Sequence, residues 1–550
     1  MTSPSGPSAV GQAAASDVVT TGSPAAAEGQ ARTVPGLGLS GGVGPSSGEP
    51  PERGYDPGPV WARYLPPVLA IALGLWRITE PSYWRDEAAT VAAVSRPFGD
   101  MIRVLGNVDA VHSLYYMMMW PLAHLFGTGE FVLRFPSVIA AAVAVTMTAA
   151  IGRRLISPWA GLAAGVVLAI LPVTSRYAQE ARSYEMVVAI AIVASYLLVR
   201  VLAAGAGQRR RWVIGYGISI AALGVLNVFG LLLVPAHAVT VALYWRRRRD
   251  SATRRLAVGW LIATAAGVVI TSPLLVLGWA QRAQIAWLQV NTSSSGINTV
   301  FSLPGSYFET TAILGILVVA VILSLDKPKE QRGAAWPRLL VELTLPWLAV
   351  PPFILFVISA VHPVYTSRYI LMCLPALALL VGAAVVTFGR IGAPVAVAVV
   401  LAAGLTAQLA VRGPAGHFDD IRALDTIVAA HARPGDAVLY TNPNAESFGK
   451  AYSYGLGKLP NVGISQAAIP SGTLGGRPAT LAQIRAALMH VKRVWVVEIN
   501  SYNSDPYLLG LNGEPVDNGS PIMNGMPFAF SDTWREHADY LVLFTRTKGS

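Results

Sequence analysis

A chain of 550 residues that is 53% hydrophobic and only 13% charged is too apolar for an ordinary soluble globule, in which about a quarter of the residues carry charge. The net charge of +11 does not indicate nucleic-acid binding, because the arginines gather in short clusters between apolar runs, as they do in the loops of membrane proteins. We therefore expect an α-helical polytopic membrane protein.

The first 58 residues are rich in Gly, Pro, Ser and Ala and contain few side chains that could form a core. They predict a disordered tail. Arg53 and Arg63 precede the first apolar run, so the positive-inside rule places this tail in the cytoplasm.

Residues 59 to 412 carry the apolar runs, and these predict about eleven transmembrane helices of a plasma-membrane protein. With eleven transmembrane helices and a cytoplasmic amino terminus, every arginine cluster falls on the cytoplasmic side and the carboxyl terminus lies outside. The runs cover residues 64–78, 131–150, 159–177, 184–203, 212–245 (a hairpin that turns near Asn227), 256–278, 311–325, 339–360, 369–388 and 393–411.

Residues 79–130 then form a long external loop, which we expect to hold the catalytic groups. Asp86 and Glu87 are adjacent carboxylates directly outside a membrane span, where they are costly to hold and therefore indicate chemistry or ion handling. The alternative is a solvated first turn of a helix, a position that favours acidic residues. Residues 114–126 are apolar but too short to cross a bilayer, which takes about 20 residues, so they predict a helix in the interface.

The predicted topology brings polar residues from distant segments to the external leaflet. Asp109, His112, Glu180, Arg182 and Arg368 all fall on the same side as Asp86. For Glu180 and Arg182, the alternative is an ion pair with each other at a helix end. For His112, the alternative to a role as a ligand is a histidine at the membrane interface whose hydrogen bonds are satisfied within the protein.

Residues 413–550 differ in character, since helical and strand patterns alternate there. This alternation predicts a small extracytoplasmic α/β domain, which could act as a lid or as a platform for an acceptor. The expected helices cover residues 418–432 and 481–489, and the expected strands cover 437–440, 493–499 and 539–545.

Several ordered motifs between residues 60 and 440 resemble the GT-C class of membrane glycosyltransferases. Within that class they are similar to the branch that contains protein O-mannosyltransferases and lipid A aminoarabinose transferases. The motifs are Asp86-Glu87, the Leu-Tyr-Tyr element at 114–116, residues 125–127 with 130–137, residues 152–155, the segment 177–184, Ser367-Arg368-Tyr369 and the segment from Asp419 to Asp436.

The resemblance implies transfer of a sugar from a polyprenyl-phosphate carrier to an acceptor hydroxyl on the external face, with Asp86 as the catalytic acidic residue. A positioned carboxylate can take the proton of an attacking hydroxyl. The leaving phosphate needs cations more than protons, which makes Arg182 and Arg368 the candidates for binding it. A single displacement of this kind would invert the anomeric configuration.

The sequence leaves the sugar open between hexoses and pentoses, with mannose as the first choice, and the acceptor open between glycolipid, polysaccharide and protein. Asp109, His112, Glu180 and Glu87 could bind substrate or a divalent metal ion, although the Pro pair found in the related enzymes is missing near Asp109. Tyr115 and Tyr116 could stack on a sugar or serve as interfacial anchors.

Two other function classes remain. A transporter or flippase would also have many spans, but it should carry charges near the midplane and a repeat that relates two halves. A receptor or scaffold could carry the external domain, but it would not need acidic and guanidinium groups gathered on one leaflet.

Overall fold

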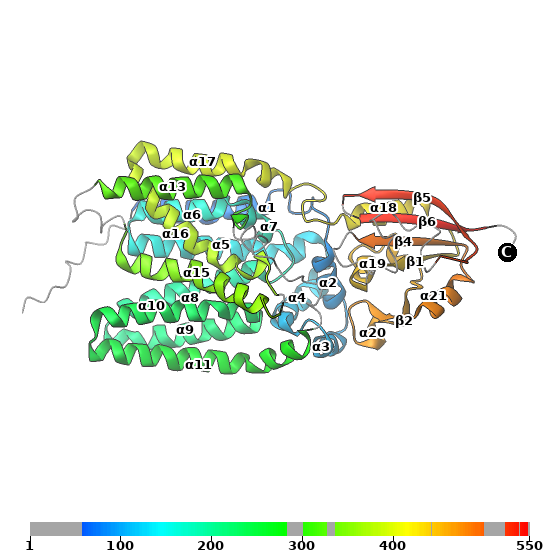
Figure 1. The fold of residues 1–550 in the computed structure, drawn as a ribbon, viewed down its shortest axis with the longest axis horizontal. Helices are drawn as coiled ribbons and strands as arrows, with labels where there is room; N and C mark the ends of the chain where they lie inside the picture. Colours follow the sequence, from blue (N-terminus) through cyan, green and yellow to red (C-terminus); the bar gives the residue numbers. More distant parts are fainter. Residues whose placement is uncertain are drawn as a thin grey trace, which may run out of the picture. The chain divides into compact units, whose positions relative to one another are not determined.

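The computed structural model describes residues 58–282, 301–326, 336–362, 364–441, 443–499, 523–537 and 539–547. The predicted amino-terminal tail lies almost entirely outside the described residues. Figure 1 shows a bundle of long helices and, beyond it, a smaller part that contains the strands.

The long apolar runs form the bundle, because a helix is the way for a single segment to satisfy its own backbone hydrogen bonds in lipid. The bundle helices are α1 (Trp61–Leu75), α5 (Glu130–Leu155), α6 (Pro158–Ile170), α7 (Pro172–Ala178), α8 (Tyr184–Ala203), α9 (Ala206–Leu226), α10 (Leu233–Arg248), α11 (Ser251–Ala280), α13 (Tyr307–Leu325), α15 (Arg338–Ser359), α16 (Leu374–Val385) and α17 (Gly389–Ala410).

In the described part of the chain, seven helical stretches are long and apolar enough to cross a membrane, or eight if the bent pair α6 and α7 is one span. The pair bends by 64° before Pro172. The expected number of about eleven is therefore not confirmed. α1 has only 15 residues, α9 carries the arginine cluster 209–211 in its first turns, and α16 and α17 fall within one apolar stretch, Leu371–Ala410.

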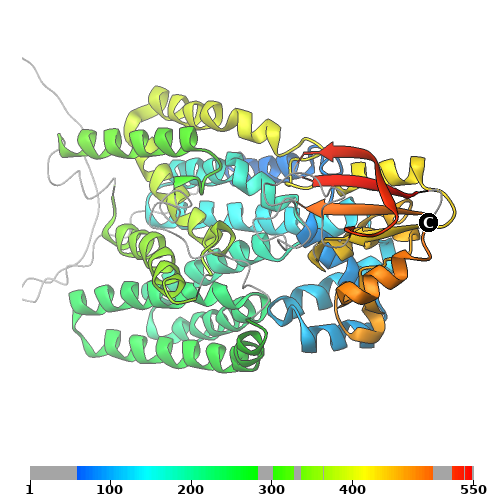
Figure 2. The ribbon, with the colours of Figure 1, turned by 45° about the vertical axis from the view of Figure 1, so that its right-hand side comes forward.

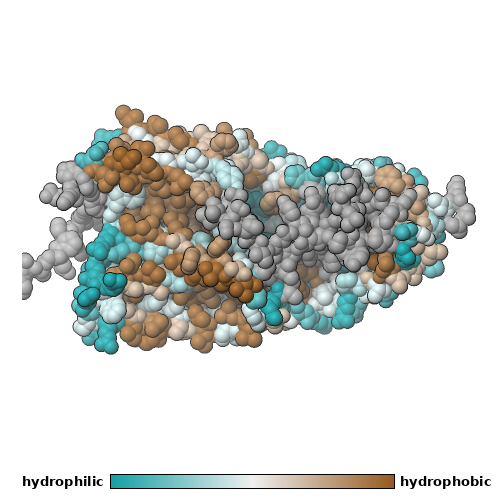
Figure 3. All heavy atoms as spheres, in the orientation of Figure 1, coloured by the Kyte–Doolittle hydropathy of each residue, from teal (hydrophilic) through white to brown (hydrophobic). Residues whose placement is uncertain are grey.

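Three short helices of the segment 79–130, α2 (Arg85–Val94), α3 (Phe98–Asn107) and α4 (Ser113–Phe126), lie at the end of the bundle where the strand-containing part begins (Figures 1 and 2). α4 coincides closely with the predicted interfacial helix. The space-filling view has hydrophobic side chains over much of the bundle and a mixed surface over the strand-containing part (Figure 3).

The carboxyl-terminal part is the predicted α/β domain. Its four-stranded sheet has the order β1-β4-β6-β5, with β1 (Asp436–Tyr440) parallel to β4 (Arg493–Ile499) and both β6 (Asp539–Arg546) and β5 (Phe528–Glu536) antiparallel to their neighbours. The predicted helices are α18 (Ile421–His431) and α21 (Leu481–Leu488).

Smaller elements complete this domain and were not predicted from the sequence. They are the edge strand β5, the two-stranded sheet β2 (Ile464–Ala467) and β3 (Gly476–Pro478), and the short helices α19 (Phe448–Ala451) and α20 (Ala468–Ser471). Ala88 of α2 belongs to the same buried cluster as Val438 and Trp495 of the sheet, so α2 and this domain share one core.

Candidate functional site

The candidate site is built on the first turn of α2, which begins with Arg85, Asp86 and Glu87. Trp84 precedes the helix in an extended conformation and provides no side-chain cap, so the acidic residues of the first turn face the positive end of the helix dipole. Consecutive helix residues point in directions about 100° apart. Glu87 is therefore fully buried, whereas the Asp86 side chain stays 19% exposed.

Glu87 is held in a bidentate ion pair with Arg134 of α5, and neither side chain is exposed. Its Oε1 accepts from Arg134 Nε at 2.9 Å and from the backbone N–H of Ala181 at 2.8 Å, and its Oε2 accepts from Arg134 Nη2 at 2.8 Å. Burial alone would raise the pKa of Glu87, but the Arg134 guanidinium outweighs it and holds this pKa well below its ordinary value. Glu87 is thus a permanent carboxylate.

Arg134 also donates to the backbone carbonyls of Ile78, Pro81 and Ser82. One buried guanidinium therefore joins α5, the chain that leaves α1 and the start of α2. The sequence predicts a catalytic role for both Glu87 and Asp86, and this geometry favours a positioning role for Glu87. Arg134 lies in the motif 130–137, for which the sequence predicted no individual role. A charged residue inside an apolar span was the signal that could have identified it.

Asp86 lies between the two arginines that the sequence predicts for phosphate binding. Arg368, in the 3₁₀ helix η4 (Ser367–Tyr369), donates from Nη1 to Asp86 Oδ2. Arg182 Nη2 lies 3.8 Å from the same oxygen. Burial alone would raise the pKa of Asp86, but the Arg368 and Arg182 guanidiniums outweigh it and lower this pKa below its ordinary value.

Arg182 continues the site toward Asp109. Its Nη1 donates to the hydroxyl of Tyr116 at 2.6 Å, and this hydroxyl donates in turn to Asp109 Oδ2 at 2.7 Å. Asp109 itself has a left-handed backbone, with φ of 59°, immediately before the 3₁₀ helix η1 (Ala110–His112). The structure thus brings Asp86, Arg182, Arg368 and Asp109 into one network.

His112 is buried next to this network, and its Nδ1 lies 3.3 Å from the hydroxyl of Ser183. Burial and the nearby Arg182 guanidinium lower the pKa of His112 to about 4. The imidazole is therefore neutral at physiological pH.

Tyr115 and Tyr116, the candidates for stacking on a sugar, both have buried rings with no exposed surface. Tyr116 instead connects Arg182 with Asp109 through its hydroxyl. Stacking by either ring stays a prediction, and it would require these rings to become accessible.

Glu180 does not form the alternative ion pair with Arg182. Its Oε2 accepts from Arg176 Nη1 at 2.8 Å, and its Oε1 has no hydrogen-bond partner among the described residues. Burial raises the pKa of Glu180 to about 7, and the Arg176 guanidinium opposes this rise only in part. Arg176, which the sequence analysis did not single out, also lies over the rings of Trp84 and Phe418.

Residues after α17 close the site from the side of the α/β domain. Asp419 is fully buried and accepts three hydrogen bonds from Arg85: from the backbone N–H at 2.8 Å, from Nε at 3.0 Å and from Nη2 at 2.7 Å. His417 Nδ1 lies 3.5 Å from Glu87 Oε2, and burial lowers the pKa of His417 to about 3. These contacts fix the start of α2 and were not predicted from the sequence.

The predicted metal ligands do not fit a divalent cation in this arrangement. No three of the His, Cys, Asp and Glu side chains within the described ranges are placed to hold one ion. Asp86 faces two guanidiniums, Glu87 is occupied by Arg134, and Asp109 accepts from Tyr116. Metal binding therefore stays a prediction.

Comparisons with known proteins agree with the resemblance. Residues 111–279 match the model of the family described as dolichyl-phosphate-mannose-protein mannosyltransferase. A comparison with curated protein sequences gives no match.

Among solved structures, ArnT from Cupriavidus metallidurans in the apo state is similar with a TM-score of 0.56 and 13% identity, over 87% of this chain and 97% of that one. ArnT from the same organism bound to undecaprenyl phosphate gives a TM-score of 0.55 and 12% identity over the same shares. The resemblance inferred from the sequence motifs is thus confirmed by the family model and by the fold.

Proposed function

We propose that this chain, a GT-C-type membrane glycosyltransferase of the branch that contains the protein O-mannosyltransferases, transfers a sugar from a polyprenyl-phosphate carrier to an acceptor hydroxyl at the external membrane face. The observation that carries the proposal is the position of Asp86, a partly exposed carboxylate between the guanidiniums of Arg368 and Arg182. One group can take a proton, and the two others can bind a phosphate.

In the proposed reaction, the acceptor hydroxyl oxygen attacks the anomeric carbon and the bond from that carbon to the phosphate oxygen breaks. The hydroxyl proton passes to Asp86, and polyprenyl phosphate leaves with the electron pair of the broken bond. Arg368 and Arg182 stabilise the charge that develops on the leaving phosphate. A single displacement inverts the anomeric configuration.

Binding of the donor should also prepare Asp86 for its role. In the structure, the two guanidiniums lower the pKa of this carboxylate, which makes it a weak base. A phosphate that takes over their hydrogen bonds removes part of this stabilisation and raises the basicity of Asp86. The base is then strongest when the donor is bound.

Arg182 has a second partner through Tyr116 and Asp109, which fixes its guanidinium beside Asp86. At the start of α2, Arg134 and the backbone N–H of Ala181 hold Glu87, and Asp419 holds Arg85. The catalytic carboxylate is thus positioned by buried polar contacts from α5, from the segment before α8 and from the segment after α17.

The donor assignment draws support from the ArnT structure, which contains undecaprenyl phosphate, and from the family description, which names dolichyl-phosphate-mannose. Mannose is accordingly the first sugar to try, with a pentose as the alternative. The acceptor remains open between glycolipid, cell-envelope polysaccharide and protein.

The test is to incubate the purified protein and its membrane extract with a panel of polyprenyl-phospho-sugars, and to follow release of polyprenyl phosphate together with the mass gained by any acceptor. We expect polyprenyl phosphate to be released from the carrier of one sugar, and this sugar to appear on one acceptor class. No release from any member of the panel, by protein shown to be folded, would contradict the proposal.

A further inference from the structure

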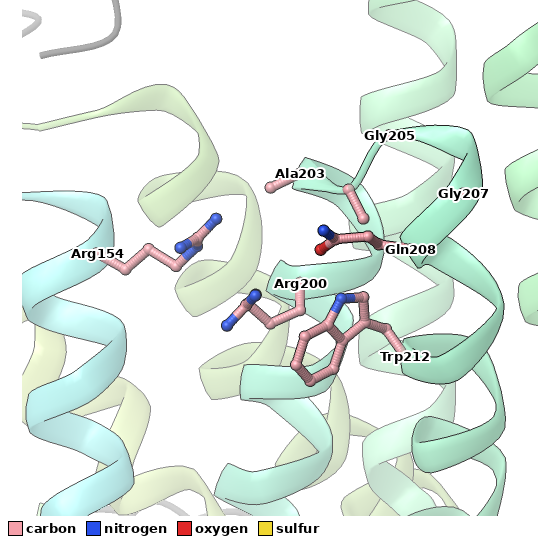
Figure 4. Close-up of a pocket in the computed structure, with 8 residues that line it drawn as sticks. Arg154, Arg200, Ala203, Gly205, Gly207, Gln208 and Trp212 are labelled. Atoms are coloured by element: carbon pink, nitrogen blue, oxygen red, sulfur yellow. The ribbon is translucent and has the colours of Figure 1, made fainter. Parts of the chain in front are cut away.

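The opposite end of the bundle carries a pocket that the proposed reaction does not use. It has a volume of about 350 Å³ and is formed where α5 and α8 end and α9 begins (Figure 4). Its lining consists of Arg154, Arg200, Ala203, Ala204, Gly205, Gly207, Gln208 and Trp212.

The position of this pocket follows from α8. This helix starts at Tyr184, next to Arg368, and ends at Ala203, in the lining of the pocket. Its 20 residues correspond to about 30 Å, which is the thickness of the hydrocarbon core. The pocket therefore lies at the level of the lipid headgroups, in the leaflet away from the candidate site.

The lining carries two guanidiniums and no carboxylate. Figure 4 shows Arg154, on α5, and Arg200, on α8, extending toward the same space from opposite sides. No hydrogen bond or ion pair is found for Arg154 in the described part of the chain. The two positive charges therefore lack a counter-ion from the lining, and they favour an anionic ligand.

Neighbouring side chains orient the second guanidinium. Arg200 lies 4.1 Å from the ring centre of Trp212 and donates to the hydroxyl of Tyr196 at 3.0 Å. These contacts fix the plane of the Arg200 guanidinium and leave its other N–H groups for a ligand. An arginine held in this way binds phosphate at a lower cost in side-chain entropy than a freely rotating one.

Gln208 and the start of α9 add neutral donors. The amide oxygen of Gln208 accepts from Arg211 at 2.9 Å, so the NH₂ group of this amide is left to donate. Gly205 precedes α9 without a side-chain cap, and nothing lies within 4 Å of a Cβ placed on Gly205 or Gly207. The backbone N–H groups of Gln208 and Arg209 donate to the carbonyl of Gly205, so at the start of this 21-residue helix the N–H groups of Ala206 and Gly207 are left to donate to a ligand.

We propose that this pocket binds the phosphate group of an anionic membrane phospholipid. Arg154 and Arg200 contact the phosphate, Gln208 and the first turn of α9 donate further hydrogen bonds, and Trp212 packs at the interface beside the lipid glycerol. The bound lipid ties the ends of α5 and α8 to the start of α9. This inference does not depend on the proposed sugar transfer.

The experiment is a binding titration of the purified full-length protein in detergent, followed by native mass spectrometry, with phosphatidylglycerol and with phosphatidylcholine. The double variant Arg154→Gln/Arg200→Gln removes the two charges. The matched control is Arg210→Gln/Arg246→Gln, which removes two exposed arginines of neighbouring helix ends that do not line the pocket. Gly207→Leu fills the pocket while both guanidiniums stay in place. Weaker lipid binding by this variant therefore reflects loss of the site and not a bundle destabilised by the loss of two arginines.

We expect the wild type to prefer phosphatidylglycerol, and both the double arginine variant and Gly207→Leu to weaken this binding about tenfold or more. The control should stay within about twofold of the wild type. Equal weakening in the control would show a diffuse surface charge effect and overturn the proposal. A third arm uses inorganic phosphate alone. If millimolar phosphate displaces the lipid completely, the pocket is a site for a free anion and the lipid assignment is wrong.

Discussion

Asp86 and Arg368 form a direct hydrogen-bonded ion pair although most of the bundle separates them in the chain. Asp86 lies in the first turn of α2, and Arg368 lies between α15 and α16. Only a topology that returns both segments to the same membrane face allows this pair. It places a carboxylate that can accept a proton beside a guanidinium that can bind a phosphate.

Replacement of Arg368 should weaken donor binding. A hydrogen bond to a charged group contributes about 1.5–3 kcal/mol, so Arg368→Gln should raise the KM for the polyprenyl-phospho-sugar roughly tenfold to a hundredfold. Arg368→Lys should restore part of this loss, because it keeps the charge but not the planar fork. Steady-state kinetics with varied donor measure both effects.

The same variant should move the pH profile. Without Arg368, the pKa of Asp86 rises toward its ordinary value, so the acid limb of the activity profile shifts to higher pH. Arg77→Gln is the control, since Arg77 is an exposed arginine paired with Glu80 on the same side. An unchanged donor KM in Arg368→Gln would remove Arg368 from the phosphate site.

Glu87→Gln should reduce stability more than it reduces the chemistry itself. Removing one partner of a fully buried ion pair costs about 3–5 kcal/mol, since Arg134 is left as an uncompensated charge. The midpoint of thermal unfolding should therefore fall clearly, while Glu80→Gln, which changes a half-buried carboxylate in a surface ion pair with Arg77, should leave it nearly unchanged. A Glu87→Gln protein of wild-type stability without activity would instead make Glu87 a catalytic group.

Glu180 should make stability depend on pH. Its pKa in the folded protein is about 7, above the value of about 4.3 in an unfolded chain. Between these values the folded state binds more protons, so the contribution of this group to the free energy of unfolding decreases as the pH rises, by at most about 1.4 kcal/mol per unit. Above pH 7 the ionised Glu180 side chain makes its full destabilising contribution to the free energy of unfolding.

The measurement is the difference between the wild type and Glu180→Gln in unfolding midpoint from pH 4.5 to 8. A difference is needed because His112 and His417, whose pKa values are lowered, act in the opposite direction over part of this range. Parallel curves for the two proteins would contradict a raised pKa at Glu180.

Asp419→Asn should affect turnover rather than donor binding. Asp419 fixes Arg85 through three hydrogen bonds and thereby fixes the first turn of α2, which carries Asp86. A small displacement of a catalytic group can cost up to about a hundredfold in rate. We expect kcat to fall about tenfold with the donor KM within about twofold of the wild type.

Asp420→Asn is the matched control for Asp419→Asn, because it changes the neighbouring carboxylate, which caps α18 by accepting from the backbone N–H of Ala423. Equal loss of kcat in both variants would indicate a general effect on the domain. Unchanged kcat in Asp419→Asn would show that Arg85 does not position Asp86.

Much of the fold follows from local pattern. The predicted limits of α8 and β4 agree with those observed, because each is a predominantly apolar segment with clear breaks at both ends. Strand β5 was missed because most of its residues are exposed or half-buried at the edge of the sheet, so it carries little apolar alternation. The expected number of about eleven spans stays unconfirmed, because seven or eight helical stretches of the described residues meet the length and hydropathy of a full crossing, and apolar length alone does not settle the short or bent helices.

The site was predictable only where topology determines it. The side of the membrane placed Asp86, Arg182 and Arg368 on one face, and the structure brings them together. The partners of Glu87 and Glu180 could not be assigned, because burial and tertiary packing decide which arginine reaches which carboxylate. The same reason applies to Tyr115 and Tyr116, since a sequence does not tell whether an aromatic ring faces a cavity or the core.

The most direct test of the account compares the wild type with Asp86→Asn in a single assay, release of polyprenyl phosphate from the preferred polyprenyl-phospho-sugar. Both proteins should be purified from membranes and matched in unfolding midpoint. A lost general base predicts a rate about 10²- to 10⁴-fold lower with little change in stability. Turnover by Asp86→Asn at the wild-type rate would contradict the central claim.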